Sequence, residues 1–189
     1  MPRHWRFRRR VLPHYRAMEA PSPADRAALS RQLGRHPRAL AGVAARCPFG
    51  APAVVVQRPY DDDGTPFPTT FWLSCRSLVD AVSRLESQGG IADFERTLAD
   101  RPDLQSSRAE ADARVRAVRR SLSQPGPRPD AGACLNARLN GGEEGDALKC
   151  LHAHAAVALA LPTYAFGDAV MHAAEAAFGE ECCVCRTTT

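Results

Sequence analysis

Cysteine and histidine side chains gather in one short segment of this 189-residue chain, at Cys150, His152 and His154. Two further cysteines, Cys47 and Cys75, each stand at the end of a predicted strand. Thiolate and imidazole groups are ligands that zinc prefers in proteins, and a structural zinc site takes four ligands in tetrahedral geometry. The three cysteines and one of the two histidines therefore predict a three-cysteine, one-histidine zinc site.

Helix geometry indicates which histidine can share a metal with Cys150. If a helix runs from Asp146 to Leu161, Cys150 and His154 lie about 40° apart on one face, and His152 lies about 200° from Cys150. His152 could join Cys150 only if the helix began later in the chain. A regular helix thus favours His154 as the fourth ligand.

The same residues support two other interpretations. If a helix start and Lys149 lowered the pKa of Cys150, the thiol would be a nucleophile with His152 or His154 as its base. The protein would then be a small enzyme acting on a phosphorylated or thiol-reactive metabolite, and Arg84 and Lys149 would bind its anionic group. Alternatively, the cysteines are inert core residues, because a thiol is commonly buried as a small apolar side chain.

The charge of the chain is unevenly distributed. The sequence has 25 basic and 21 acidic residues, but residues 1–17 hold six arginines and no acid, so the remainder is almost neutral. Nucleic-acid binding is therefore expected only if this basic start belongs to the protein. Met18, followed by Glu19 and a Pro/Ser-rich stretch, has the character of a natural start. We expect residues 1–17 to be an upstream extension and a chain that begins at Met18 to fold normally.

Apolar segments are short throughout the chain. The longest, from Ala155 to Leu161, is far below the roughly 20 residues that a membrane-spanning helix needs, and the basic start has no apolar segment typical of a secretory signal. We expect a cytoplasmic protein with no membrane partner. Cysteines usually stay reduced in that compartment, which favours metal ligation or burial over disulfides.

Hydrophobic periodicity and turn residues predict an α+β fold, in which a small three-stranded antiparallel meander packs against a layer of about five helices. The expected strands are Ala39–Cys47, Ala53–Arg58 and Phe67–Cys75, and the expected helices are Ala24–Leu33, Ser77–Gln88, Ile91–Ala99, Pro102–Leu122, Asp146–Leu161 and a last helix from Gly167 or Asp168 to Phe178. The predicted organisation is a disordered basic extension (1–23), one domain (24–178) with a flexible loop (123–145), and a disordered cysteine-rich tail (179–189).

Several short motifs together resemble a known family. They are Arg46-Cys47-Pro48, Asp63-Gly64-Thr65-Pro66-Phe67-Pro68-Thr69, Trp72-Leu73-Ser74-Cys75, Ser83-Arg84-Leu85-Glu86, Lys149-Cys150-Leu151-His152 and Phe166-Gly167-Asp168. Over roughly residues 32–178 the chain is similar to an actinobacterial family known only as a domain of unknown function, number 501. The resemblance implies no activity. Its motif favours His152, whereas helix geometry favours His154, so the histidine ligand stays open.

Overall fold

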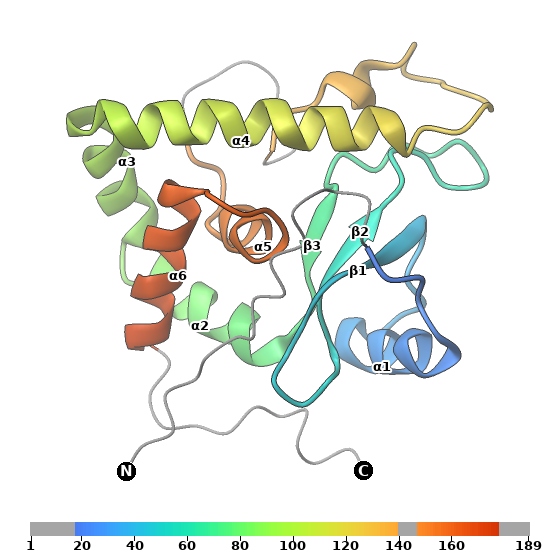
Figure 1. The fold of residues 1–189 in the computed structure, drawn as a ribbon, viewed down its shortest axis with the longest axis horizontal. Coiled ribbons are helices and arrows are strands. Elements are labelled where there is room, and N and C mark those ends of the chain that lie inside the picture. The colour runs from blue at the N-terminus through green and yellow to red at the C-terminus, as the bar shows by residue number, and fades with distance from the viewer. Residues whose placement is uncertain (1–17, 140–146, 178–189) are drawn as a thin grey trace.

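The computed structural model describes residues 18–139 and 147–177, which form a three-stranded sheet and six α-helices (Figure 1). The predicted α+β class is confirmed. In chain order the elements are α1 (Pro23–Leu33), β1 (Leu40–Arg46), β2 (Pro52–Gln57), β3 (Phe71–Leu73), α2 (Arg76–Ser87), α3 (Gly90–Asp100), α4 (Pro102–Ser121), the 3-10 helix η2 (Ala133–Asn136), α5 (His152–Ala160) and α6 (Ala165–Ala177). None of the helices in the described ranges is long and apolar enough to cross a membrane.

The sheet is an antiparallel meander in the order β1-β2-β3, as expected. β2 is the central strand and is buried along its whole length. Its side chains alternate, so Val54 and Val56 join the main apolar cluster while Val55 points to the opposite face. One face packs against α5, which contacts all three strands, and α1 contacts β2. The chain connects these layers through α2, α3 and α4, and α6 covers α5 (Figure 1).

Two of the expected strands differ from those observed. The third is only Phe71–Leu73, because Pro68 cannot donate a ladder hydrogen bond and Cys75 already caps the start of α2. The first strand contains register shifts between Leu40 and Arg46, which interrupt the regular alternation assumed for its side chains.

A buried arginine joins the connections that follow β2 and α4. Arg119 of α4 is fully buried. Its guanidinium donates to Thr70 Oγ1 at 2.9 Å, to the Cys134 carbonyl at 3.2 Å, and to the carbonyls of Ala137 and Pro68. These bonds fasten η2 and the loop before β3 to one helix. The described part of the predicted 123–145 loop is thus held in place up to Leu139.

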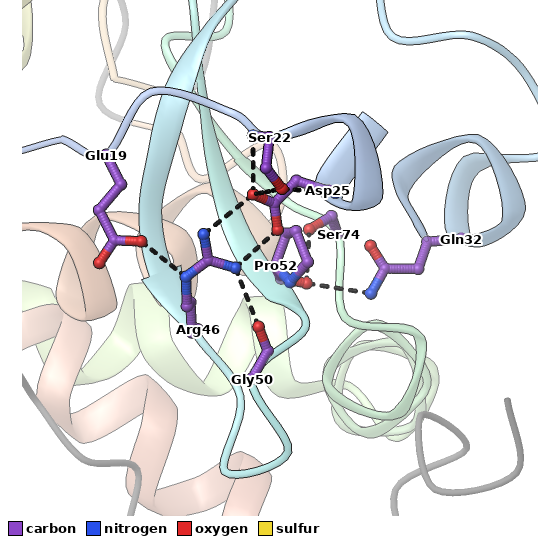
Figure 2. A network of polar contacts seen from close by, with 8 residues as sticks. All are labelled: Glu19, Ser22, Asp25, Gln32, Arg46, Gly50, Pro52 and Ser74. Atoms are coloured by element: carbon purple, nitrogen blue, oxygen red, sulfur yellow. Dashed lines mark hydrogen bonds and ion pairs between the residues drawn. The ribbon is translucent and has the colours of Figure 1, made fainter. Parts of the chain in front are cut away.

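The N-terminal end of the described chain is held by a polar network, which Figure 2 shows. Ser22 and Asp25 form a capping box at the start of α1, and the left-handed Gly34 ends this helix. The guanidinium of Arg46 donates from Nη1 and Nη2 to both carboxylate oxygens of Asp25, at 2.6 and 3.0 Å, and from Nε to Glu19 Oε2 at 2.7 Å. Glu19 also pairs with the backbone of β1. The segment from residue 19 onward is therefore joined to the sheet.

This ion pair gives a prediction on pH-dependent stability. The hydrogen bonds from Arg46 hold the pKa of Asp25 well below its usual range. The pair therefore contributes its full stabilisation above the unfolded-state pKa of about 3.9, and this contribution is lost as the pH falls below it toward the folded-state pKa. Asp25→Asn should lower the free energy of unfolding by about 2 kcal/mol at pH 7, because hydrogen bonds between charged groups contribute about 1.5–3 kcal/mol.

Urea unfolding of both proteins between pH 2 and pH 8 measures this difference. The matched control is Asp93→Asn, which removes an exposed pair with Arg96 on α3 and should change stability little. A difference between Asp25→Asn and the native chain that stays constant down to pH 2 would contradict the assignment.

Candidate functional site

The start of α5 determines which of the sequence-predicted ligands meet. The helix begins at His152 and not at Asp146, so Cys150 precedes it and the expected helical relation between Cys150 and His154 is wrong. This later start is the condition under which His152 can join Cys150.

Glu86 of α2 stabilises the start of α5 at His152. Its Oε1 atom accepts the backbone N–H of Leu151 at 2.5 Å. Without Glu86 this N–H group would be an unpaired donor at the helix N-terminus.

Glu86, Cys150 and His152 form one cluster of metal-ligating groups. One ligand atom from each residue lies within 4.8 Å of the other two, and all three side chains are partly buried. The distance between Glu86 Oε1 and His152 Nδ1 is 3.1 Å. Two ligands on one tetrahedral zinc ion would lie about 3.3 Å apart, given zinc–nitrogen and zinc–oxygen distances near 2.0–2.2 Å. The cluster can therefore hold a metal with small side-chain adjustments.

Hydrogen bonding fixes the orientation of the His152 ring. Its Nε2 atom lies 3.2 Å from the carbonyl oxygen of Val79 and 3.2 Å from Ser83 Oγ. If Nε2 carries the proton and donates to Val79, the Nδ1 lone pair faces Glu86. A histidine ligand commonly donates its second ring N–H to a carbonyl in this way. Two acceptors 3.1 Å apart would repel one another, and either a proton on Nδ1 or a metal cation between Nδ1 and Glu86 removes this repulsion.

The Cys150 thiol lies at the N-terminal end of α5, but its environment does not favour the thiolate. Burial raises the pKa of Cys150, and the negative charge of Glu86 raises it further. The backbone N–H groups of Ala153 and His152 act in the opposite direction and are outweighed. The expectation that the helix start and Lys149 would lower this pKa is therefore wrong, because it left out desolvation and Glu86.

The other predicted zinc ligands do not belong to this cluster. Cys47 and Cys75 are both buried at the ends of β1 and β3, and Cys75 is the residue that precedes α2. Among the residues that the structure describes, the cluster of potential metal ligands does not include Cys47, Cys75 or His154. It contains Glu86 instead. Nothing in the spacing could have selected Glu86, which precedes Cys150 by 64 positions and is a carboxylate among expected thiols.

His154 lies on the side of α5 away from His152, as the angle of about 200° between positions two apart requires. It is almost completely buried, and its Nδ1 atom lies 2.6 Å from the hydroxyl oxygen of Tyr164. Burial lowers the pKa of His154 to about 3, and the positive charge of Arg108 lowers it as well. The imidazole is therefore neutral. Its Nε2 atom is buried and has no hydrogen-bond partner among the described residues.

Arg84 and Lys149, the predicted partners of an anionic group, are both exposed. Arg84 lies on α2, and Lys149 lies on the segment that precedes α5. A cavity of about 610 Å³ is present elsewhere, between α3, α4 and α5, and neither residue lines it. A role of these two residues in anion binding stays a prediction.

The comparisons with known proteins place the chain in one family. Residues 43–172, more than half of the chain, match the model of the family described as Protein of unknown function (DUF501). The chain belongs to this family. The match covers Glu86, Cys150 and His152, and also His154 and the residues that line the cavity. No curated protein and no solved structure matches. The resemblance seen in the motifs is thereby confirmed, and membership of DUF501 assigns no activity.

The environment of Cys150 gives a prediction about its reactivity. Because burial and Glu86 raise the pKa of this thiol, its alkylation by iodoacetamide in the chelator-treated, metal-free chain should reach half of the maximal rate above pH 8.5, the ordinary cysteine value. Glu86→Gln should move the midpoint to lower pH, since it removes a negative charge and keeps an oxygen that can accept from Leu151. Peptide-resolved mass spectrometry measures the rate at Cys150 separately from other cysteines. A midpoint below pH 8 in the native chain would contradict this reasoning.

Proposed function

We propose that this member of the DUF501 family is a cytoplasmic zinc protein in which Glu86, Cys150 and His152 bind the metal. The convergence of the three ligand groups at the start of α5 supports it most directly. Carboxylate, thiolate and imidazole are all zinc ligands, and the thiolate disfavours the hard cations magnesium and calcium. The metal would connect α2 to α5.

The number of protein ligands distinguishes a closed zinc site from an open one. Structural zinc sites are closed by four protein ligands, whereas three protein ligands leave a position for water or another small ligand. Three ligands gather here. The proposed site therefore differs from the closed set first expected, with Cys47 and Cys75, and its fourth position is accessible to an exogenous group. The half-buried position of His152 and Glu86 is consistent with such access.

The free state of the described cysteines supports the proposed cytoplasmic location. The four described ones, Cys47, Cys75, Cys134 and Cys150, are all free, which agrees with a reducing compartment. In the proposed role the metal stabilises the contact between α2 and α5 and keeps its fourth position open to an exogenous ligand.

A thiol enzyme is the second candidate function, and one observation favours it. A thiol enzyme needs a nucleophile, a base and a group that orients the base. Cys150 and His152 would be the first two, and Glu86 beside His152 supplies the third. The raised pKa of Cys150 and the contacts of His152 Nε2 with Val79 and Ser83 weigh against it. Such an enzyme would act on a phosphorylated or thiol-reactive metabolite bound near Lys149 and Arg84. Rapid modification of Cys150 at neutral pH would favour this function over the zinc site.

The zinc proposal predicts that two conservative variants of the ligands weaken zinc binding. In the full chain, with Cys182, Cys183 and Cys185 replaced by serine to remove the thiols of the tail, we expect one zinc ion per chain. Glu86→Gln and Cys150→Ser should each weaken zinc binding at least about tenfold, the lower end of the loss seen when even an outer-shell partner is removed. Competition with a chromophoric chelator measures the affinity.

The matched control is Cys134→Ser. Cys134 is a buried cysteine whose thiol donates to the Pro59 carbonyl at 3.2 Å, outside the proposed site. This variant should bind zinc as the parent does. Zinc bound with equal affinity by Glu86→Gln, Cys150→Ser and the parent would locate the metal elsewhere and refute the proposal, as would the absence of zinc binding from the parent.

A further inference from the structure

A serine of α2 lies beside the pair of His152 and Glu86 and is not a ligand of the proposed zinc site. Ser83 Oγ is 3.2 Å from His152 Nε2, and His152 Nδ1 is 3.1 Å from Glu86 Oε1. A serine hydrolase triad places its nucleophile within hydrogen-bond reach of a histidine and orients that histidine with a carboxylate. The two ring nitrogens have the same partners here as in such a triad, with the hydroxyl at Nε2 and the carboxylate at Nδ1.

The spacing of Ser83 and Glu86 on α2 allows one imidazole ring to contact both side chains. Residues three apart are neighbours on the surface of a helix, and His152 faces them from the start of α5. Ser87 of the same helix donates its hydroxyl to the Arg84 carbonyl at 2.8 Å. Ser83 contacts the imidazole instead, and it is exposed. A substrate can therefore reach the Ser83 hydroxyl from solvent.

The tautomer of His152 determines whether the ring can accept the proton of Ser83. With the proton on Nδ1, the ring donates to Glu86, and the lone pair of Nε2 accepts the Ser83 hydroxyl. The Val79 carbonyl oxygen, 3.2 Å from Nε2, then receives no hydrogen bond from the ring. It receives one when Nε2 takes the proton, so this carbonyl stabilises the imidazolium more than the neutral ring. A general base requires this preference for the form that arises during the reaction.

We propose that the metal-free chain is a serine hydrolase of carboxylic esters, with Ser83 as the nucleophile, His152 as the base and Glu86 as the residue that positions His152. Ser83 Oγ forms a bond to the ester carbonyl carbon while its proton passes to Nε2. The bond to the alcohol oxygen then breaks, and the alcohol leaves with that proton. A water molecule next gives a proton to Nε2 and adds its oxygen to the acyl carbon. The acid is released, and Nε2 returns the proton to Ser83 Oγ.

This activity goes beyond the proposed zinc function and uses the same imidazole in its other tautomer. Zinc bound between Nδ1 and Glu86 leaves the ring proton on Nε2, so His152 can no longer accept the proton of Ser83. Zinc therefore inhibits the hydrolase, and removal of the metal activates it. The two proposals can be tested separately, because Cys150 is a ligand of the metal alone and Ser83 takes part in hydrolysis alone.

Covalent labelling with a fluorophosphonate tests the hydrolase in the full chain after treatment with a chelator. This reagent phosphonylates an activated serine hydroxyl and releases fluoride, and peptide-resolved mass spectrometry should find the label on Ser83. Ser83→Ala should also lower the rate of p-nitrophenyl acetate hydrolysis about 100-fold, the lower end of the contribution of general acid–base catalysis. The matched control, Ser87→Ala, removes another exposed serine of α2 and should leave both measurements unchanged.

Glu86→Gln tests the positioning role in the same metal-free chain. The amide oxygen can still accept the backbone N–H of Leu151, but the amide N–H group then faces Nδ1 and favours the tautomer with the proton on Nε2. The variant should lower kcat for p-nitrophenyl acetate and leave KM unchanged, because Glu86 does not contact the ester. A purely structural role of Glu86 would not separate the two constants in this way.

Three outcomes would overturn the hydrolase proposal. They are the absence of a label on Ser83 in the folded, metal-free chain, equal hydrolysis by Ser83→Ala and the native chain, and an equal kcat of Glu86→Gln and the native chain. The zinc proposal fails by a different result. If the native chain binds one zinc ion and Ser83 is still labelled at the metal-free rate, the hydrolase is supported and the metal lies elsewhere.

Discussion

The hydrogen bond from the Leu151 backbone N–H to Glu86 is the interaction on which the candidate metal site depends. It fixes the first residue of α5 by supplying, from α2, an acceptor that the local sequence lacks. A start at Asp146, six residues earlier, would place Cys150 and His152 about 200° apart around the helix axis. With the start at His152, the thiol, imidazole and carboxylate converge on the side of α2, and His154 is directed to the side of α4. One carboxylate is therefore both a helix cap and a candidate ligand.

The central position of α5 is possible because most of its side chains are small. Ala153, Ala155, Ala156 and Ala158 are all buried, and alanine favours the helix while allowing neighbouring elements to approach closely. Gly167 of α6 extends this close packing, since a Cβ atom there would lie 2.3 Å from the Tyr164 ring. The same packing that holds Tyr164 against His154 makes the environment of that imidazole dry. Burial of a polar group in the centre of the fold follows from the alanine-rich sequence around it.

Elements whose signals are local could be predicted from the sequence, and those set by tertiary contacts could not. The capping box and Gly34 define α1 within one residue, and the stripe of apolar residues with Pro102 defines α4. By contrast, no local residue marks the start of α5, because its acceptor is Glu86, 65 positions away from Leu151. The predicted start of β3 is lost because Pro68 cannot donate a ladder hydrogen bond, and its carbonyl accepts from Arg119 of α4 instead. Of the candidate site, Cys150 and His152 were accessible to sequence reasoning, whereas the carboxylate ligand required the fold.

The polar groups buried in this protein fall into two classes. Arg119 is fully buried, yet four acceptors satisfy its guanidinium, and Asp25 is fully engaged by Arg46 and Ser22. These groups have structural roles, because every bond they make joins parts of the same fold. His154 differs, since one ring nitrogen is fixed by Tyr164 and the other is left without a partner in the described chain. The fold thus gives all three guanidinium nitrogens of Arg119 an acceptor, whereas Nε2 of His154, whose ring packs against Phe166, has no partner among the described residues.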